Sequence, residues 1–345
     1  MNKKIRLAFV GAGFVAQQTH LPCFSTNPNF QITHIADPCV DLRERIAQKY
    51  NIPYQVNSHL ELISNKDIDA FIVTLPRKLT FYVVRDLINA NKWVFTEKPL
   101  TLNSKDGYEL LELIKNRKVS VKTGYMKQHD AGTDLFRQLL MQIPKQDILS
   151  IKGYCHMGDS YAKPFGDIKG KSFVEIPYNE QAFPAWLPKE NYWAFEQFIN
   201  VFSHLTHLLE LLLEEKIVFK DSLTNKNGEG LILCSISNIP ICLDFIRGNQ
   251  NQWNEGIFIT TANKNLSIKY PPAFLRNVPS KICVKQGEST KESTEILPEW
   301  SWSFMNQTYG FYEFITNSSN NYKEVNLAIQ QVEFAEEVFR SILNI

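Results

Sequence analysis

The feature that most constrains this chain is the stretch IRLAFVGAGFVA at residues 5–16, where an apolar run meets two closely spaced glycines. The apolar run predicts a short buried strand, and a helix is expected within residues 14–28. Between them lies the pattern G-x-G-x-x-A. In this pattern Gly11 permits a tight turn, Gly13 lets the backbone approach a pyrophosphate, and Ala16 allows close packing of helix and strand. Free N–H groups at the start of the helix would face the phosphates, so the stretch predicts a dinucleotide-binding turn.

An acidic residue follows in the place that such a turn requires. Asp37 ends the second predicted strand, QITHIAD, where a carboxylate can bind a ribose 2′-hydroxyl. The carboxylate would repel a 2′-phosphate, and Pro38 follows it rather than an arginine. We therefore expect NAD(H) in preference to NADP(H). Arg43, on the next predicted helix, is the residue that would favour NADP(H).

Strand-like and helix-like segments alternate with short connections through the first 125 residues. Regular alternation of this kind implies a parallel sheet covered by helices on both faces, a doubly wound α/β fold. Further strands are expected at 69–76, 93–98 and 119–125.

After residue 125 the rhythm changes, and strands follow one another in sequence. Consecutive strands favour an antiparallel sheet, so the second part is expected to be an α+β domain. We predict domains at 1–125 and 126–345. Helices are expected at 131–142, about 193–215, 304–317 and 323–343, and strands at 147–156, 230–238, 239–248, 255–263, 265–271 and 281–287. The segments ISNIPI and TANKNL resemble hairpin turns.

Composition excludes several classes of partner. The net charge is +1, and no block of five like charges occurs, so neither nucleic acid nor an anionic membrane is expected as a partner. No apolar segment is long enough to predict a transmembrane helix. The six cysteines are scattered without a zinc-like spacing. These features are typical of a reduced, cytoplasmic protein.

The stretch VFTEKPLT at 94–101 places Glu97, Lys98 and Pro99 at the carboxyl end of a predicted parallel strand. Open α/β sheets bind ligands at that edge. A lysine there can donate or accept the proton of an alcohol or ketone if partial burial lowers its pKa. The alternative is a solvated lysine paired with Glu97.

The stretch NVFSHLTH at 200–207 places Asn200, His204 and His207 on one face of a predicted helix. Two histidines three residues apart suggest half of a metal site, but zinc requires a third ligand and usually a helical i, i+4 pair. We therefore expect no metal. His207 by itself reads as a histidine that packs in the core or against the next element.

Four motifs give the chain a family resemblance: GAGFVA, DIDAFIVTLP (67–76), EKPL (97–100) and TGYMKQHD (123–130). In order and spacing they resemble the Gfo/Idh/MocA oxidoreductases. The resemblance implies an N-terminal Rossmann domain and a C-terminal domain with an open, largely antiparallel sheet. It also implies a homodimer or homotetramer formed through that sheet.

The family carries D-x-G-x-H-x-x-D on a helix that points at the nicotinamide, and NVFSHLTH is the best match here. Asn200 stands at the first Asp, Phe202 at the Gly, His204 at the His and His207 at the last Asp. The resemblance thus assigns proton transfer and substrate binding to Lys98 and His204, with Asn200 as a polar neighbour. Because Asn200 lacks the family's charge, both groups should release protons more readily.

Other residues are candidates for substrate contact. Arg77 stands where the family commonly has asparagine, and its guanidinium can pair with a substrate carboxylate or phosphate. Its alternative is a surface arginine. Lys127 and, less so, His129 follow the last Rossmann strand near the family's substrate position. An aromatic stretch at 157–190 either roofs the pocket or packs as an ordinary loop.

The sequence thus predicts an NAD(P)(H)-dependent oxidoreductase that acts on a hydroxyl or keto carbon of a sugar, sugar nucleotide or cyclitol. One alternative is an imine reductase of the same family. Another is a catalytically inactive regulator that keeps the nucleotide site. The residues expected to bind the cofactor are Gly11, Gly13, Phe14, Val15, Asp37, Thr74, Pro76, Glu97 and Lys98.

Overall fold

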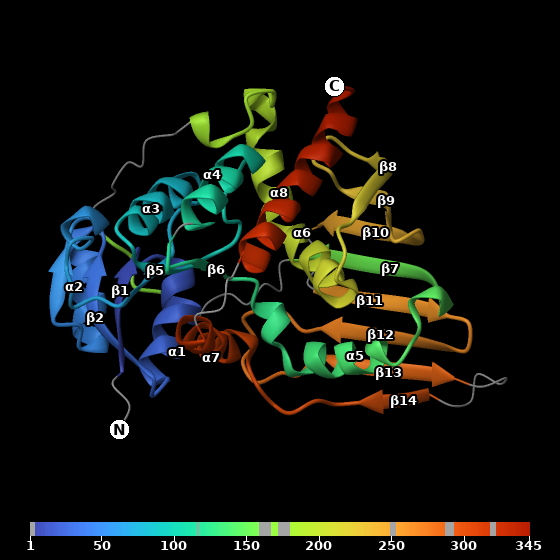
Figure 1. Ribbon diagram of the computed structural model, residues 1–345, viewed down its shortest axis with the longest axis horizontal. Helices are drawn as coiled ribbons and strands as arrows, with labels where there is room; N and C mark the ends of the chain where they lie inside the picture. The colour runs from blue at the N-terminus through green and yellow to red at the C-terminus, as the bar shows by residue number, and fades with distance from the viewer. Residues whose placement is uncertain are drawn as a thin grey trace. The chain divides into compact units, whose positions relative to one another are not determined.

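The structure, a computed structural model, describes residues 4–115, 117–158, 167–171, 180–248, 253–286, 293–317 and 322–345. The chain divides into two compact units, each assembled from three segments (Figure 1). The first unit comprises Met1–Gly124, Pro164–Trp186 and Gln307–Ile329. The second comprises Tyr125–Lys163, Leu187–Asn306 and Gln330–Ile345.

A six-stranded sheet in the order β3-β2-β1-β4-β5-β6 forms the centre of the first unit. Every neighbouring pair is parallel. This order is that of the Rossmann fold, and it confirms the predicted fold class. The strands are β1 (Ile5–Val10), β2 (Phe30–Ala36), β3 (Tyr54–Val56), β4 (Ala70–Val73), β5 (Trp93–Thr96) and β6 (Val121–Thr123).

Helices connect these strands. A π-helical turn, η1 (Ala16–His20), leads directly into α1 (Leu21–Thr26), so the predicted first helix is present. The others are α2 (Val40–Tyr50), α3 (Arg77–Asn89) and α4 (Ser104–Lys115), with short 3₁₀ turns η2 (His59–Glu61) and η5 (Glu180–Ala182). β3 was not predicted from the sequence, because it is a three-residue edge strand with two exposed residues.

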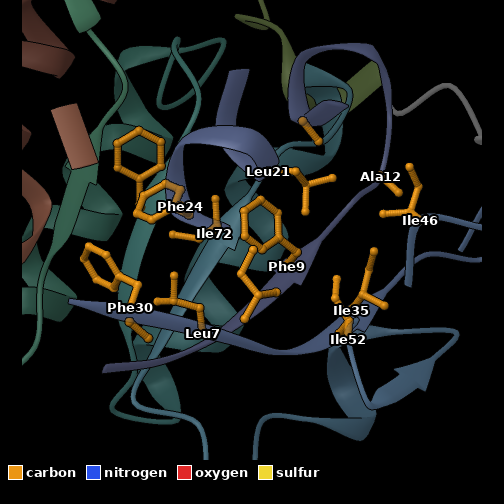
Figure 2. Packing of buried hydrophobic residues seen from close by; sticks show 14 of the residues in the cluster. Leu7, Phe9, Ala12, Leu21, Phe24, Phe30, Ile35, Ile46, Ile52 and Ile72 are labelled. Atoms are coloured by element: carbon orange, nitrogen blue, oxygen red, sulfur yellow. The ribbon is translucent and has the colours of Figure 1, made fainter. Parts of the chain in front are cut away.

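The core of the first unit combines aliphatic side chains with a group of packed phenylalanines (Figure 2). Phe24 of α1 lies between Phe9 of β1 and Phe30 of β2, with ring centroids 6.0 and 5.1 Å away. Phe311, from the C-terminal helix α7 (Ser303–Thr316), stacks on Phe30 at 6.1 Å. A phenylalanine that is buried fully contributes about 1.5–3 kcal/mol. Residues near the C-terminus therefore help to close the core of the N-terminal sheet.

An eight-stranded sheet in the order β14-β13-β12-β11-β7-β10-β9-β8 forms the second unit (Figure 1). Among the described residues, β7 and β10 are the one parallel pair, and the other neighbours are antiparallel. This confirms the expected largely antiparallel sheet. The strands are β7 (Ile148–Met157), β8 (Val218–Thr224), β9 (Gly230–Ile236), β10 (Ile239–Arg247), β11 (Asn254–Thr261), β12 (Lys264–Tyr270), β13 (Lys281–Gln286) and β14 (Ser293–Ile296).

Two hairpin turns of this sheet were predicted from the sequence, and its two edge strands were not. Ser237 and Asn238 join β9 to β10 with φ of 48° and 67°, the left-handed pair that a two-residue hairpin requires. The TANKNL turn joins β11 to β12 as predicted. The edge strands β8 and β14 were missed, because neither contains a fully buried residue.

Two helices of the second unit, α5 (Ala131–Met141) and the long α6 (Tyr192–Leu213), agree with the expected positions. The 3₁₀ turns η3 (Met126–His129), η4 (Lys145–Asp147) and η6 (Lys189–Asn191) were not predicted. α7 and α8 (Tyr322–Leu343) each contribute residues to both units. Of the helices described, none is long and apolar enough to cross a membrane.

Candidate functional site

The glycine turn lies between β1 and the helical segment that contains η1. Gly11 has φ of +93°, and a Cβ at this position would overlap the carbonyl oxygen of Thr74. Any other residue there would therefore be strained twice. Gly13 is exposed, and an added Cβ would have no atom within 4 Å. Phe14 and Val15 follow and are half-buried. The turn is thus constrained at Gly11 and unobstructed at Gly13, which leaves room for a pyrophosphate to approach the backbone.

Asp37 connects this turn to the end of β2. Its Oδ2 accepts a hydrogen bond from the Ala12 N–H at 2.8 Å, and its Oδ1 accepts one from the Cys39 N–H at 2.9 Å. Asp37 is buried, with an exposed fraction of 9%. The sequence predicted a ribose ligand here. The structure shows that the same side chain also holds the glycine turn against the next loop.

Arg43 lies behind the Asp37 turn and is buried. One guanidinium nitrogen donates to the Asp37 carbonyl and to Asn57 Oδ1, both at 2.7 Å. Two short hydrogen bonds orient this nitrogen toward protein groups. Arg43, the residue that would favour NADP(H), therefore stabilises the turn after Asp37.

Thr74 and Pro76 follow β4 at the same edge of the sheet. The Thr74 hydroxyl donates to the carbonyl oxygen of Gly11 at 2.9 Å, which links the β4 end to the glycine turn. Pro76 is exposed and precedes α3, and Arg77 is half-buried as the first residue of that helix. The structure thus brings together four of the predicted cofactor residues, Gly11, Gly13, Asp37 and Thr74.

Glu97 and Lys98 lie directly after β5, and a histidine that the sequence analysis missed contacts them. His20 Nε2 lies 2.6 Å from Glu97 Oε1, and the imidazole is 1% exposed. The Lys98 N–H donates to Glu97 Oε2 at 3.2 Å. Burial opposes ionisation of Glu97, but the hydrogen bond and charge of His20, together with Lys98, hold the pKa of Glu97 below its usual value.

His20 gave no sequence signal because it is separated from the EKP motif by 77 positions. His20 ends η1, which follows the glycine turn, and its ring lies 5.1 Å from that of Phe95 in β5. Lys98 is half-buried, and its peptide bond to Pro99 is cis. The Glu97 carboxylate bonds to the His20 ring and to the Lys98 N–H, and it thereby stabilises the turn that carries Lys98.

Lys127 lies in η3 of the second unit and forms a buried ion pair with Glu255 of β11. Lys127 is 4% exposed and Glu255 is 0% exposed. The Trp253 indole N–H donates to Glu255 Oε2 at 3.0 Å, and the rings of Trp253 and Tyr270 lie 5.5 and 5.6 Å from the lysine nitrogen. The lysine is therefore enclosed by one acid and two aromatic rings. His129 is half-buried, and its carbonyl accepts a hydrogen bond from Asn306 at 3.0 Å.

Asn200 and His204 lie on α6 and are half-buried, whereas His207 is 2% exposed. Tyr125 contacts both histidines. Its ring stacks on His207 with centroids 4.0 Å apart, and it meets the His204 ring edge-on at 5.8 Å. Asn200 and His204 thus form the more accessible part of the predicted face, and His207 packs as the sequence suggested.

Phe202 lies on the opposite side of α6. It is 1% exposed and stacks on Phe245 of β10, with centroids 4.2 Å apart and 2° between the ring planes. Its bulk therefore fills the core between helix and sheet. Within the described residues, no cluster of three histidine, cysteine or acidic side chains is arranged to hold a metal ion.

Of the aromatic residues in the stretch 157–190, Phe183 is buried in the first unit, with Lys78 Nζ 5.8 Å from its ring centroid. Trp186 is half-buried. Tyr161, Phe165 and Tyr178 lie outside the described residues. Lys98 and the cofactor turn belong to the first unit, and Lys127, Asn200 and His204 belong to the second.

Residues 5–125 match the sequence model of a family described as an oxidoreductase family with an NAD-binding Rossmann fold. Over these residues the chain is similar to the Gfo/Idh/MocA oxidoreductases. The match confirms the resemblance drawn from GAGFVA, EKPL and the neighbouring motifs.

Curated relatives of this chain include inositol 2-dehydrogenase from Salmonella typhimurium, 28% identical over 130 residues that cover 37% of this chain and 39% of the relative. Another is dTDP-3,4-didehydro-2,6-dideoxy-alpha-D-glucose 3-reductase from Streptomyces violaceoruber, 25% identical over 138 residues that cover 40% of each. The match therefore spans about two fifths of the length of these relatives.

Solved structures extend the likeness along the chain at the level of fold. A 3-ketoreductase from Actinomadura kijaniata, in complex with NADP and TDP-benzene, superposes with a TM-score of 0.75. It covers 97% of this chain and 96% of its own at 15% identity. At this identity the match shows a shared fold alone, and it extends over both sheets of the chain.

Proposed function

We propose that the protein is an NAD(P)(H)-dependent oxidoreductase that acts on a hydroxyl or keto carbon of a sugar, sugar nucleotide or cyclitol. The observation that carries this proposal is the edge of the Rossmann sheet, where an open glycine turn and the Glu97–Lys98 turn follow strands of one sheet. The names of the relatives, an inositol 2-dehydrogenase and a sugar-nucleotide 3-reductase, support the substrate class and favour neither alternative.

Residues 1–125 would hold the cofactor. Gly13, with Phe14 and Val15 beside it, would face the pyrophosphate, and Asp37 would accept from a ribose hydroxyl. Thr74, Pro76, Glu97 and Lys98 complete the proposed set at the ends of β4 and β5. NAD(H) is favoured because Asp37 is present and Arg43 is directed toward protein groups. When bound, the nicotinamide supplies or accepts the hydride.

Residues 126–345 would hold the substrate and the oligomer contacts. Lys98 and His204 would move the hydroxyl proton, and Asn200 would hold a polar group of the substrate by hydrogen bonding. Arg77 would pair with an anionic group where the substrate has one. Lys127, also proposed for substrate binding, reaches a substrate only by leaving Glu255, so its contribution should be the smaller.

We further propose a homo-oligomer formed through the second sheet. Leu223, Leu231 and Leu233 on the strands β8 and β9 are 76%, 42% and 46% exposed. An apolar row on an edge of this kind favours association with a second copy. Light scattering after gel filtration would measure the mass directly. The six cysteines all lie among the described residues and form no disulfide with one another, which suits a reducing compartment, and we propose the cytoplasm.

The function is tested by two measurements on the whole chain. Titration with NADH and NADPH should quench tryptophan fluorescence, and NAD⁺ should be reduced in the presence of a cyclitol, sugar or sugar nucleotide from a broad panel. Lys98→Ala should lose turnover by roughly 10²–10⁴-fold, the contribution of a general acid or base, while the other cofactor residues still bind the dinucleotide. Unchanged turnover in this variant would remove Lys98 from the mechanism, and a wild-type chain that binds neither dinucleotide would refute the function.

A further inference from the structure

A five-residue segment at 167–171 lies against the glycine turn of the first unit. Gln17 forms both hydrogen bonds of an amide pair with Ile168: its Nε2 donates to the Ile168 carbonyl at 3.0 Å, and its Oε1 accepts from the Ile168 N–H at 2.8 Å. The same Nε2 donates to the carbonyl of Ala12 at 2.8 Å. Gln17 is 7% exposed. One buried side chain therefore fastens residues 167–171 to the turn itself.

The other end of the segment is attached to the start of α2, immediately after Asp37. Asp41 Oδ2 accepts from the Lys171 N–H at 2.7 Å, and Arg45 donates to the Lys169 carbonyl at 3.2 Å. Gly170 packs so closely on Cys39 that an added Cβ would overlap the cysteine sulfur. The segment is thus bound at one end to the glycine turn and at the other to the start of α2. The Asp37 carboxylate bonds to both regions, through the N–H groups of Ala12 and Cys39.

We propose that residues 167–171 form a strap beside the adenosine-ribose end of a bound nicotinamide dinucleotide, and that Gln17 is the positioning residue that holds it. The proposal rests on the proposed function. A dinucleotide that lies across Gly13 and Asp37 would border the groups that anchor the strap, because Ala12 and Cys39 bond directly to the Asp37 carboxylate.

The strap should act chiefly on release of the dinucleotide. A strap that packs beside the adenosine ribose stabilises the bound state, so its loss weakens binding. A strap that made no such contact would slow entry and departure equally and leave the affinity unchanged. Differences in affinity among variants of one site appear mainly in the dissociation rate. We therefore expect loss of the strap to raise the dissociation rate roughly tenfold and to leave the association rate nearly unchanged.

Two variants displace the strap by independent routes. Gln17→Ala removes both bonds to Ile168. Gly170→Val directs new carbon atoms at Cys39 and pushes the strap away while every residue of the glycine turn stays as it is. The control is Gln48→Ala, an exposed glutamine on α2. Stopped-flow fluorescence would give the association and dissociation rates of NADH and NADPH for each chain.

Faster dissociation in both Gln17→Ala and Gly170→Val, with Gln48→Ala unchanged, supports the strap. A wild-type dissociation rate in Gly170→Val overturns it, even if Gln17→Ala differs, because Gln17 would then act through Ala12 alone. If Gln17→Ala does not fold, Gly170→Val decides the question by itself. A wild-type chain that binds neither dinucleotide is a distinct outcome, because it refutes the proposed function and removes the ligand on which the strap depends.

Discussion

The ring of Tyr125 stacks on the imidazole of His207, with centroids 4.0 Å apart and 7° between the planes. The same tyrosine meets His204 at 82°, so one ring contacts two histidines on successive turns of α6. Tyr125 is 2% exposed and cannot move without repacking its neighbours. We infer that Tyr125 orients the His204 ring.

The first prediction concerns this contact. Tyr125→Phe keeps the ring and should retain turnover, whereas Tyr125→Leu removes the aromatic ring that stacks on His207. In Tyr125→Leu we expect kcat to fall by about tenfold and the pH profile of kcat/KM to shift, because His204 would lose its fixed orientation. A lower kcat with an unchanged pH profile would indicate a purely structural role for Tyr125.

The second prediction concerns His20 and Glu97. His20→Ala leaves a largely buried carboxylate without its nearest donor, which should cost about 1–3 kcal/mol at neutral pH. The pKa of Glu97 is lowered in the folded state, so its contribution to stability is present above the unfolded pKa and is lost as the pH falls through the folded pKa. Without His20 the pKa of Glu97 rises, and this loss should begin at higher pH.

Urea unfolding of wild-type and His20→Ala chains between pH 4 and 8 would measure the effect. His20→Asn can still donate a hydrogen bond and should fall between them. Identical pH dependence of the free energy of unfolding in all three chains would contradict the coupling of His20 to Glu97.

The third prediction concerns the buried Lys127–Glu255 pair. Lys127→Met leaves the Glu255 carboxylate buried and uncompensated and should cost about 3–5 kcal/mol. Combining it with Glu255→Leu should recover most of that loss, since an apolar pair needs no desolvation of charge. The exposed pair Lys145–Glu215 is the matched control, where Lys145→Met should cost under about 1 kcal/mol. Additive losses in a double-mutant cycle at 127 and 255 would show that the ion pair is not coupled.

The fourth prediction concerns Glu210, one turn beyond His207. Burial raises the pKa of Glu210 to about 7 from its ordinary 4.5, although hydrogen bonds from the Ile217 N–H and Gln331 oppose the shift. Between these pH values the folded chain keeps a proton that the unfolded chain releases. The free energy of unfolding should therefore fall as pH rises from about 4.5 to 7, by up to about 3 kcal/mol.

Glu210→Gln cannot ionise and should lack this slope. Between acidic pH and pH 8 it should therefore lose less free energy of unfolding than wild type does. Glu112→Gln, at an exposed position, serves as the control and should show the same pH dependence of the free energy of unfolding as wild type. Thermal or urea unfolding across this pH range measures both. Parallel stability curves for wild type and Glu210→Gln would show that Glu210 ionises in the folded chain as it does in water.

Local patterns were sufficient for much of the fold. The alternation of strands and helices, the glycine turn and the polar turns after Ile236 and Thr261 lie within short windows, and their elements appear where expected. The edge strands β3, β8 and β14 were missed because an exposed strand carries little apolar periodicity. The parallel pairing of β7 with β10 was not evident either, since α6 and two strands separate them in the chain.

The sequence by itself determined the alternation of strands and helices, the glycine turn and the residue types at the strand ends, because these depend on neighbours within a few positions. Only the tertiary structure decided which partner each polar group has. His20 bonds to Glu97 across 77 positions, Lys127 to Glu255 across 128, and Gln17 to Ile168 across 151. A single sequence contains no signal for such pairs, since burial and charge compensation arise only when distant segments pack together.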